Sequence, residues 1–293
     1  RLVETIERVD LFKDVKAITR DEAEATGLIE PIGPEIDRAY LEAIQSLSLS
    51  TPQLHLKVVY TPLHGTGASF IPGLLSGCGY VDFMAVEEQM APDPEFSTVK
   101  APNPEDPAAF DLALKLAHRE QADLVLATDP DGDRVGCAVR NTAGNYEHLS
   151  GNQIGALLLA YILARRNERG DLPSRGVMVK TIVTGNLGKK VAEAYGVKTV
   201  ETLTGFKYIG EKINEFEQSG EFNFLFGYEE SNGFLVGTFG RDKDAVGASY
   251  LIAEMAAYHK EQGKNLLQVL EELHRQHGYF KENLVSVELQ DMS

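Results

Sequence analysis

Three aspartates at alternate positions, Asp129, Asp131 and Asp133, directly follow the apolar residues 124–127. Carboxylates this close together repel one another, and each raises the pKa of the others unless a cation neutralises them. A hard divalent cation suits such oxygens, and three of them leave room for water or a phosphate oxygen, as Mg²⁺ prefers. Ligands of open α/β sheets bind outside the carboxyl ends of strands, so the placement fits a site. The spacing therefore predicts a magnesium site at these aspartates.

Two other interpretations of this segment remain open on the local pattern alone. One is an acidic surface turn, because Asp, Pro and Gly all favour turns. The other is an aspartyl phosphatase, since such enzymes also place Asp-x-Asp after a strand. An EF-hand is excluded, because a count from Asp129 puts Arg134 and Arg140 where that loop needs Gly and Glu. Arg134 can either clamp a phosphoryl oxygen or pair with the aspartates.

A second polar loop, residues 227–233, follows the apolar residues 223–228. Glu229 and Ser231 in this loop can bond vicinal sugar hydroxyls, with the carboxylate accepting and the hydroxyl doing either. Without further context, a polar turn is the favoured interpretation. No histidine lies near Ser231 in the sequence, so a serine–histidine triad is not supported.

Two glycine-containing segments can approach a ligand. Thr204 is predicted to cap the helix after it, Gly205 allows a ligand near the backbone, and Lys207 lies near the helix start, where anions bind. Residues 60–67 form a glycine-rich turn that can approach a phosphate, with His64 more typical of a structural role. The chain lacks the Walker pattern, so we do not expect it to bind a nucleoside triphosphate.

Two lysines also have alternative roles. Lys180 lies in an apolar strand context, where it can bind phosphate or transfer a proton at the strand end. Alternatively, it is an edge-strand charge that discourages aggregation. Lys243 belongs to the mixed-charge residues 241–244, a pattern that is normally a solvated loop.

Strand-like and helix-like segments alternate, which predicts an α/β fold with two units at residues 40–150 and 151–275. Asp106 and Pro107 are a good helix N-cap and first helical residue. A polar break is expected at residues 165–175. Predicted strands cover residues 58–60, 80–86, 124–127, 177–179 with 182–183, and 223–228. Predicted helices cover residues 110–117, 154–162, 188–194, 208–216, 249–259 and 266–274.

Composition limits the classes of partner. The formal net charge is −16, from 28 Lys and Arg against 44 Asp and Glu, which argues against nucleic acids and anionic membranes. No apolar run approaches the ~20 residues that span a bilayer. Cys78 and Cys137 are far apart, so neither a disulfide framework nor a zinc site is expected. A reducing cytoplasm is the default location. The chain begins with Arg1 and shows no signal peptide, so we expect a fragment or a processed chain.

Together, these segments resemble the α-D-phosphohexomutase superfamily, which includes phosphoglucomutases and phosphomannomutases. The resemblance covers about residues 40–275, and residues 205–207 and 243–246 are more similar to the phosphoglucomutase/phosphopentomutase branch. The matching segments occur in family order at residues 61–67, 102–105, 129–134, 204–207, 227–231 and 243–244. The resemblance implies two consecutive α/β/α three-layer domains with mixed, mostly parallel sheets.

The resemblance also implies a reaction and residue roles. A phosphoserine passes its phosphoryl group to a hexose monophosphate, and the bisphosphate reorients and returns the other phosphoryl group. The implied Mg²⁺ ligands are Asp129, Asp131 and Asp133. The implied catalytic residues are Arg134, which contacts the phosphoserine, and Lys243, an acid/base or phosphate contact. The implied substrate-binding residues are Lys180, Thr204, Gly205, Lys207, Glu229 and Ser231.

Family members have four domains, and the chain lacks both the serine loop of the first and the phosphate-binding loop of the fourth. Residues 40–150 then correspond to the metal-binding domain II and 151–275 to the sugar-binding domain III. Residues 1–39 are the tail of the first domain, and 276–293 lead to the fourth. The expected partners are a sugar phosphate and domains I and IV of the same polypeptide, and the chain alone is expected to be inactive.

One residue departs from the family pattern. Some members place a histidine shortly after the sugar-binding loop, which corresponds to residues 227–233, whereas this chain has Phe234 there. An acid/base role of that histidine therefore cannot be transferred, and substrate preference stays open. A non-catalytic module that binds a sugar phosphate or a metal is the alternative function.

Overall fold

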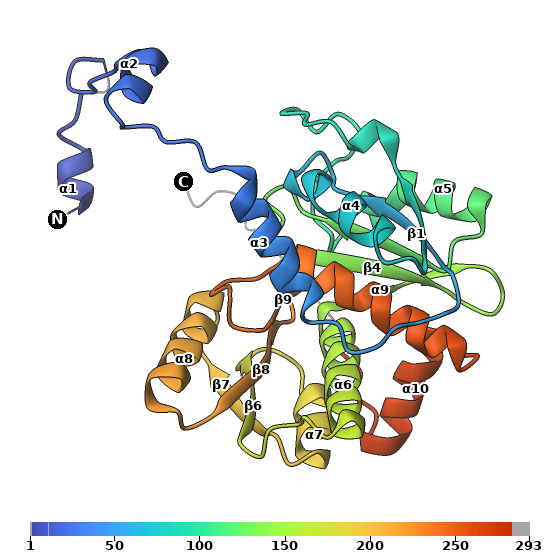
Figure 1. Ribbon diagram of the computed structural model, residues 1–293. Coiled ribbons are helices and arrows are strands. Elements are labelled where there is room, and N and C mark those ends of the chain that lie inside the picture. Colours follow the sequence, from blue (N-terminus) through green and yellow to red (C-terminus); the bar gives the residue numbers. More distant parts are fainter. Residues whose placement is uncertain (1, 11, 283–293) are drawn as a thin grey trace, which may run out of the picture. The chain divides into compact units, whose positions relative to one another are not determined.

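The computed structural model describes residues 2–10 and 12–282, and it divides into two compact units, Arg1–Tyr40 and Leu41–Ser293 (Figure 1). The smaller unit contains α1 (Leu2–Ile6) and α2 (Arg20–Ala25), and α3 (Pro34–Gln45) begins in it. Thr19 caps α2, because its side chain accepts a hydrogen bond from the Glu22 amide.

The first sheet of the larger unit has five strands in the order β2-β1-β3-β4-β5. β1 pairs in parallel with β2 and β3, whereas β3–β4 and β4–β5 are antiparallel. Its strands are β1 (Leu56–Thr61), β2 (Val81–Ala85), β3 (Leu124–Thr128), β4 (Val135–Arg140) and β5 (Tyr146–Leu149). One face packs against α5 (Asp111–Glu120), and the other against α4 (Ile71–Ser76) and α9 (Ala245–Glu261). Short 3₁₀ helices occur at η1 (Thr66–Ser69), η2 (Glu87–Gln89) and η3 (Pro107–Phe110).

The second sheet has four strands in the order β7-β6-β8-β9. β6 pairs in parallel with β7 and β8, and β8–β9 is antiparallel. Its strands are β6 (Gly176–Thr181), β7 (Lys198–Thr202), β8 (Asn223–Glu229) and β9 (Gly233–Val236). α8 (Phe206–Ser219) packs against β6 and β8, while α6 (Gly151–Arg169) contacts β8 and α7 (Leu187–Ala194) contacts β7. α10 (Leu266–His277) packs against α6 and α7. Both sheets therefore lie in α/β/α domains with mostly parallel strands.

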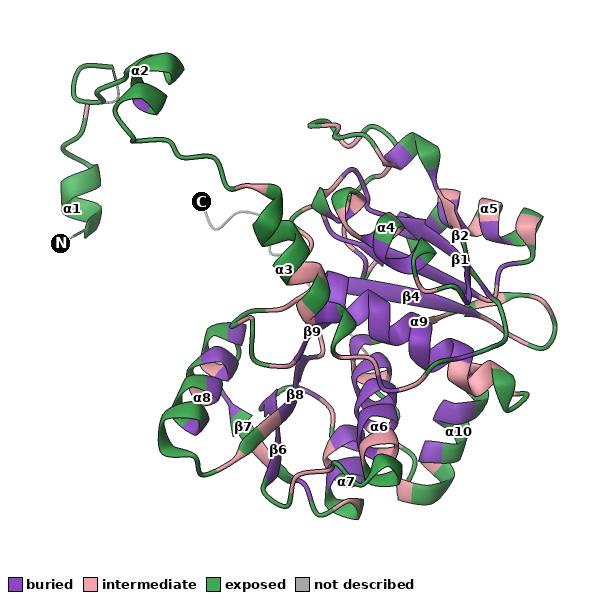
Figure 2. Cartoon of the chain, viewed as in Figure 1, coloured by how far each residue is buried: buried purple, intermediate pink, exposed green. Residues whose placement is uncertain are grey.

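Helix α9 follows the second sheet in sequence but contacts β1, β3 and β4 of the first sheet as well as β9 and α6. It is buried all round from Ala245 to Ala257, which explains why its apolar residues show little helical periodicity (Figure 2). Its buried Glu254 accepts hydrogen bonds from the Leu49 and Ser50 amides and from the Tyr161 hydroxyl. One helix thus joins the two sheets.

Most predicted elements are confirmed, and Asp106 caps η3 through the Ala108 amide. The predicted strand at residues 182–183 is wrong. The Thr184 amide bonds to the Thr181 carbonyl and turns the chain there, so Ile182 and Val183 are exposed despite being β-branched.

The predicted polar break is also wrong at its start. α6 continues through residue 165 to Arg169 and ends at Gly170, whose φ is 72°. The predicted linker at residues 276–293 lies outside the described residues beyond 282.

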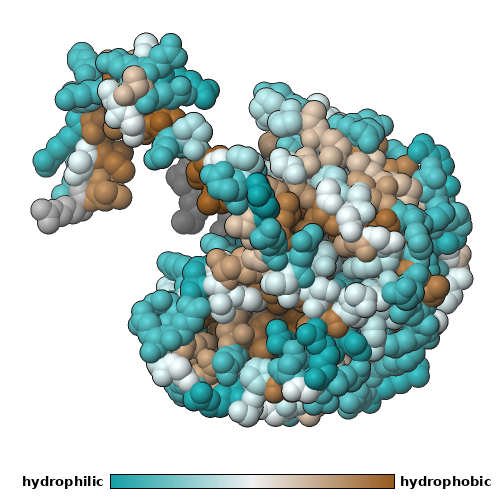
Figure 3. Space-filling model, viewed as in Figure 1, coloured by the Kyte–Doolittle hydropathy of each residue, from teal (hydrophilic) through white to brown (hydrophobic). Residues whose placement is uncertain are grey.

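Polar residues cover most of the side of the larger unit that Figure 3 shows, as its charge composition implies. Cys78 and Cys137 are both free thiols. Among residues 2–10 and 12–282, no helix combines the length and the apolar character needed to cross a bilayer.

Candidate functional site

The three aspartates lie in the loop between β3 and β4, at the carboxyl end of a buried parallel strand. Gly132 turns this loop with φ 74°, and its amide donates to the Asp129 carbonyl. The glycine-rich turn at residues 60–67 packs directly against the aspartate loop. The Thr66 amide donates to the Pro130 carbonyl at 2.9 Å, and a Cβ on Gly65 would lie 2.4 Å from the Pro130 Cα. That turn therefore positions the aspartate loop, with glycine required for the close approach.

One carboxylate oxygen from each of Asp129, Asp131 and Asp133 lies within 4.8 Å of the others. Asp129 is buried, Asp133 is half-buried and Asp131 is exposed. These are hard oxygen donors that leave further coordination positions, so the donor set fits Mg²⁺. Burial raises the pKa of Asp129 to about 6, and hydrogen bonds from Arg134 oppose the shift.

Arg134 is the main partner of Asp129. Its Nε donates to Asp129 Oδ2 at 2.7 Å, and its backbone amide donates to Oδ1 at 2.9 Å. Its Nη1 donates to Glu105 Oε1 at 2.9 Å. Burial lowers the pKa of Arg134, but the hydrogen bond and charge of Asp129 outweigh it, so the net pKa is raised. Because Arg134 donates to both carboxylate oxygens of Asp129, the geometry does not suit Asp129 as a phosphatase nucleophile. A contact between Arg134 and a phosphoryl group stays a prediction.

The proposed sugar loop, here residues 229–233 from the end of β8 to the start of β9, is bonded directly to the aspartate loop. Arg134 and Gly233 form an antiparallel bridge, and the Val135 amide donates to the Asn232 carbonyl at 3.1 Å. The Ala245 amide at the start of α9 donates to the Gly132 carbonyl at 3.2 Å. Two loops on different sheets therefore form one junction.

Lys243 crosses this junction. Its Nζ lies 2.9 Å from Asp133 Oδ2 and 2.9 Å from Asp242 Oδ1, and 17% of its side chain is exposed. A Cβ on Gly233 would lie 2.3 Å from Lys243 Cδ, so the lysine stem needs a glycine beneath it. Burial lowers the pKa of Lys243, yet the two aspartates outweigh it and the net pKa is raised. The interpretation as a solvated loop is wrong for Lys243, because these contacts leave it half-buried.

Glu229 is buried, and its Oε1 accepts a hydrogen bond from the Gly205 amide at 2.9 Å. Burial raises the pKa of Glu229, opposed by that hydrogen bond and by the charge of Lys243. Ser231 is half-buried. The sequence thus indicated Glu229 and Ser231 as candidate site residues, but not the hydrogen bond from the Gly205 amide that fixes Glu229.

The predicted cap of α8 is wrong. Gly205, not Thr204, occupies the N-cap position, and its φ of 119° suits glycine. Thr204 is exposed, and so is Lys207, whose Nζ lies 5.0 Å from the centre of the Tyr208 ring. The substrate contacts of these residues remain predictions.

Lys180 lies on β6, an interior strand, so its interpretation as an edge-strand charge is wrong. It is 1% exposed, and its Nζ donates to the carbonyls of Thr181 at 3.2 Å and Thr184 at 2.8 Å. Glu201 Oε1 lies 3.5 Å away. The ammonium therefore holds the turn between β6 and α7, whereas its contact with a substrate remains a prediction.

The predicted residues form two groups. Asp129, Asp131, Asp133, Arg134 and Lys243 lie in one cluster. Glu229 and Gly205 adjoin it, because Lys243 Nζ lies 5.5 Å from the ring centre of Phe206, the residue after Gly205. Lys180 belongs to a second network under the β6–α7 turn, which Thr184 joins to Glu230.

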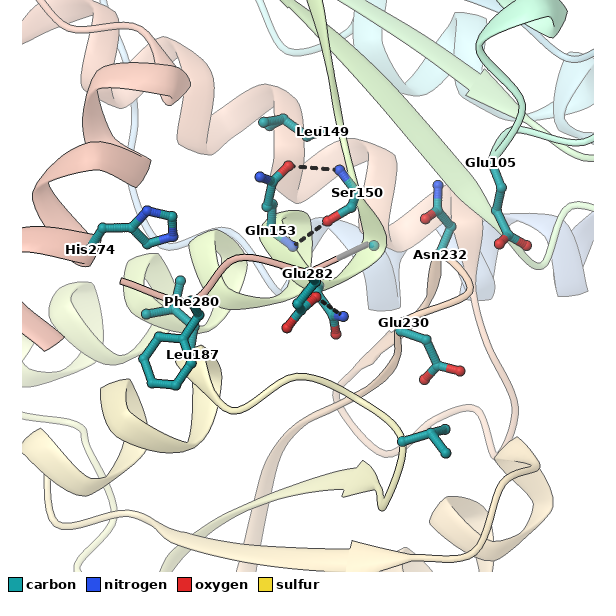
Figure 4. Close-up of a pocket in the computed structure, with 13 residues that line it drawn as sticks. Glu105, Leu149, Ser150, Gln153, Leu187, Glu230, Asn232, His274, Phe280 and Glu282 are labelled. Carbon is teal, nitrogen blue, oxygen red and sulfur yellow. Dashed lines mark hydrogen bonds between the residues drawn. The ribbon is translucent and has the colours of Figure 1, made fainter. Parts of the chain in front are cut away.

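A cavity of about 640 Å³ lies beside the junction. Glu105 and Glu230 line it, although neither was predicted as a site residue. Figure 4 shows Glu105, Glu230 and Asn232 on one side of it and Leu187, His274 and Phe280 on the other. Glu105 lies in the matching segment 102–105, which was a signal for its role beside Arg134. Glu230 gave no signal apart from its place between Glu229 and Ser231.

Comparisons with known proteins agree with this arrangement. Family models described as phosphoglucomutase/phosphomannomutase alpha/beta/alpha domains II and III match residues 38–144 and 150–277. A phosphoglucomutase of Staphylococcus epidermidis is 43% identical over 263 residues, which are 90% of this chain and 47% of that protein. A phosphoglucomutase of Staphylococcus aureus is 40% identical over 267 residues, with 91% and 47% covered. The chain thus spans about half the length of these relatives.

Solved structures are similar too. A putative phosphomannomutase from Thermus thermophilus superimposes with a TM-score of 0.66 at 25% identity, covering 89% of this chain and 57% of that one. The phosphoglucomutase pp63/parafusin from Paramecium gives a TM-score of 0.61 at 19% identity, covering 83% and 42%, which supports the fold alone.

Proposed function

This chain belongs to the phosphoglucomutase/phosphomannomutase family, and we propose that it forms the metal-binding and sugar-binding middle of a phosphohexomutase. The whole polypeptide interconverts a sugar 1-phosphate and 6-phosphate through a phosphoserine and a bisphosphate. Glucose phosphate is the proposed substrate, and mannose phosphate is the alternative. The observation that carries the proposal is the bonded junction between the aspartate loop and the Glu229 loop, with Lys243 between them.

The proposed domain boundaries follow the family matches closely. Residues 40–150 form the metal-binding domain II and residues 151–275 the sugar-binding domain III, beside matches at 38–144 and 150–277. Residues 1–39 would be the tail of domain I, and 276–293 the link to domain IV. Those two domains of the same polypeptide are the proposed partners, and the two free cysteines suit a cytoplasmic protein.

Asp129, Asp131 and Asp133 would hold Mg²⁺, which neutralises charge on the transferring phosphoryl group when bound. Arg134 fixes the orientation of Asp129 through two hydrogen bonds to its carboxylate. The same guanidinium is the proposed contact of the phosphoserine. Lys243 can donate a proton or contact a phosphate at the edge shared with the sugar loop.

Glu229 and Ser231 would read the sugar hydroxyls, the carboxylate accepting and the hydroxyl donating or accepting. The Gly205 amide keeps the Glu229 carboxylate in one orientation, which limits the sugar poses it accepts. Thr204, Gly205 and Lys207 at the start of α8 are proposed phosphate contacts. Lys180 is a proposed substrate-binding residue, and its buried ammonium would act through the turn whose Thr181 and Thr184 carbonyls it bonds.

Substrate profiling of the full-length parent tests this function. We expect turnover of glucose 1-phosphate to exceed that of mannose and pentose phosphates, and no turnover by this chain alone. Real turnover by the isolated chain would overturn the claim that the nucleophile lies elsewhere. A parent reading frame without the serine loop upstream and the phosphate loop downstream would favour the non-catalytic module.

A further inference from the structure

The side chain of Glu230 makes a set of contacts that neither of its neighbours shares. Its Oε2 accepts a hydrogen bond from Thr184 Oγ1 at 2.8 Å and lies 3.3 Å from Thr181 Oγ1. The two threonine hydroxyls lie 2.7 Å apart, and both threonines are buried. Two protons serve three contacts, so the two short ones form a relay from Thr181 to Thr184 to Glu230.

The turn that carries these hydroxyls is itself fixed. Lys180 donates to the carbonyls of Thr181 and Thr184. The Ile182 amide donates to the Thr202 carbonyl at 2.8 Å, and the Gly185 amide donates to Asn152 Oδ1 at 2.8 Å. Because both ends of the turn are bonded to neighbouring elements, it is a firm support for the Glu230 carboxylate.

The backbone of Glu230 is fixed as well. A Cβ on Gly151, the first residue of α6, would lie only 2.1 Å from the Glu230 carbonyl oxygen. Figure 4 shows Glu230 beside Asn232 on the loop, with the start of α6 at Ser150 facing them. The next residue before it, Glu229, is held by the Gly205 amide from another element. Glu230 is thus the point at which the sugar loop is attached to the β6–α7 turn.

We propose that Glu230 is a positioning residue that sets the placement of Glu229 and Ser231 through its bond to the Thr181–Thr184 pair. This inference rests on the proposed sugar-binding role of Glu229 and Ser231. The Glu230 carboxylate is needed as a hydrogen-bond acceptor. Since both threonine hydroxyls lie against the same oxygen, Oε2, and Thr184 donates to it, an amide oxygen can replace it.

The test uses amide hydrogen exchange in this chain, with the Gly205 amide as the reporter of Glu229 placement. Glu230→Ala and Thr184→Val should each speed Gly205 exchange about tenfold or more, which is about 1.4 kcal/mol, as expected for a lost hydrogen bond to a charged group. Glu230→Gln should stay near the wild-type rate. The matched control is Glu193→Ala, since Glu193 is exposed on α7 and pairs with Lys190 there.

The Leu126 amide in β3 separates local from global opening, and its exchange should speed up much less than that of the Gly205 amide in every variant. Unchanged Gly205 exchange in both Glu230→Ala and Thr184→Val would overturn the proposal. Equal acceleration in Glu230→Gln and Glu230→Ala would also overturn it, because charge and not hydrogen bonding would then hold the loop.

In the full-length parent, Glu230→Ala should raise KM for the sugar phosphate about tenfold while Mg²⁺ affinity stays constant, and Glu230→Gln should restore KM. An unchanged KM would overturn the positioning role. A parent without mutase activity would instead refute the proposed function, and the exchange rates would still decide the role of Glu230.

Discussion

Replacing Gly151 by alanine should displace the sugar loop and destabilise the chain. A Cβ at this position lies 2.1 Å from the Glu230 carbonyl oxygen, 2.6 Å from Asn232 Oδ1 and 2.7 Å from the Asn232 amide nitrogen. Contacts below 3.0 Å essentially never occur for real Cβ atoms. Two of the three opposing atoms are backbone atoms and Asn232 is buried, so no flexible side chain can move aside.

The magnitude follows from the atoms that must move. Overpacking a well-packed site costs about 1–3 kcal/mol. The Asn232 carbonyl of the loop also accepts a hydrogen bond from the Val135 amide, and losing that bond costs about 1 kcal/mol more. The free energy of unfolding should therefore fall by about 2–4 kcal/mol.

Gly73 supplies a matched control with the opposite sign. It lies within α4, and a Cβ built on it meets no atom within 4 Å. Gly73→Ala should raise the free energy of unfolding by about 0.5–1 kcal/mol, because glycine is entropically costly in a helix. Denaturant unfolding followed by circular dichroism measures both variants. The reasoning would be refuted if Gly151→Ala were as stable as the wild type, or if Gly73→Ala lost as much stability as Gly151→Ala.

Three other perturbations probe the charged residues. Lys243→Met should tighten Mn²⁺ binding to the chain about tenfold, because a competing charged hydrogen bond to Asp133 is removed. Weaker Mn²⁺ binding by the variant in titration calorimetry would contradict this and show that Lys243 supports the aspartates in binding the metal. Glu254→Ala should lower the free energy of unfolding by about 3 kcal/mol or more, and Glu254→Gln by less, since buried donors lose their acceptor. Burial lowers the pKa of His259 to about 4, so the folded state keeps it neutral. The contribution of neutral His259 to the free energy of unfolding is then fully present above the unfolded pKa of about 6.5. It falls as the pH drops toward 4, by about 1–2 kcal/mol at pH 5. His259→Gln should remove that part of the pH dependence of urea midpoints, while exposed His55→Gln should not.

Strands with continuous apolar runs could be predicted because they are buried on both faces, as β3 is. The strands that escaped prediction lack this signal. β7 lies at the sheet edge and has a single apolar residue, Val200, among polar ones, and β9 is a four-residue strand that starts with Gly233. β4 contains Gly136, which is needed because a Cβ there would lie 2.3 Å from the Pro104 carbonyl oxygen. A tertiary contact thus fixed a residue that local propensity disfavours in a strand.

The types of site residue were visible in the sequence, whereas their partners were not. The Asp129 cluster is local, so its spacing alone indicated a metal site. The bridge between Arg134 and Gly233 joins segments from different sheets, and no periodicity records it. Lys180 shows the same limit, because its role depended on whether β6 lies at an edge or inside the sheet.

The position of α9 explains how one chain can keep the proposed metal site and the proposed sugar loop at a fixed separation. The amide of its first residue, Ala245, donates to the Gly132 carbonyl in the aspartate loop, and the preceding Asp244 amide donates to the Phe234 carbonyl beside the sugar loop. The body of the helix then packs against both sheets. A change in the angle between the sheets would have to break these hydrogen bonds and expose the buried helix together. In the proposed reaction, each end of the sugar in turn faces the same phosphoserine. The distance between the aspartate cluster and the sugar loop must therefore stay constant. We therefore expect the moving parts of the catalytic cycle to lie outside residues 41–282.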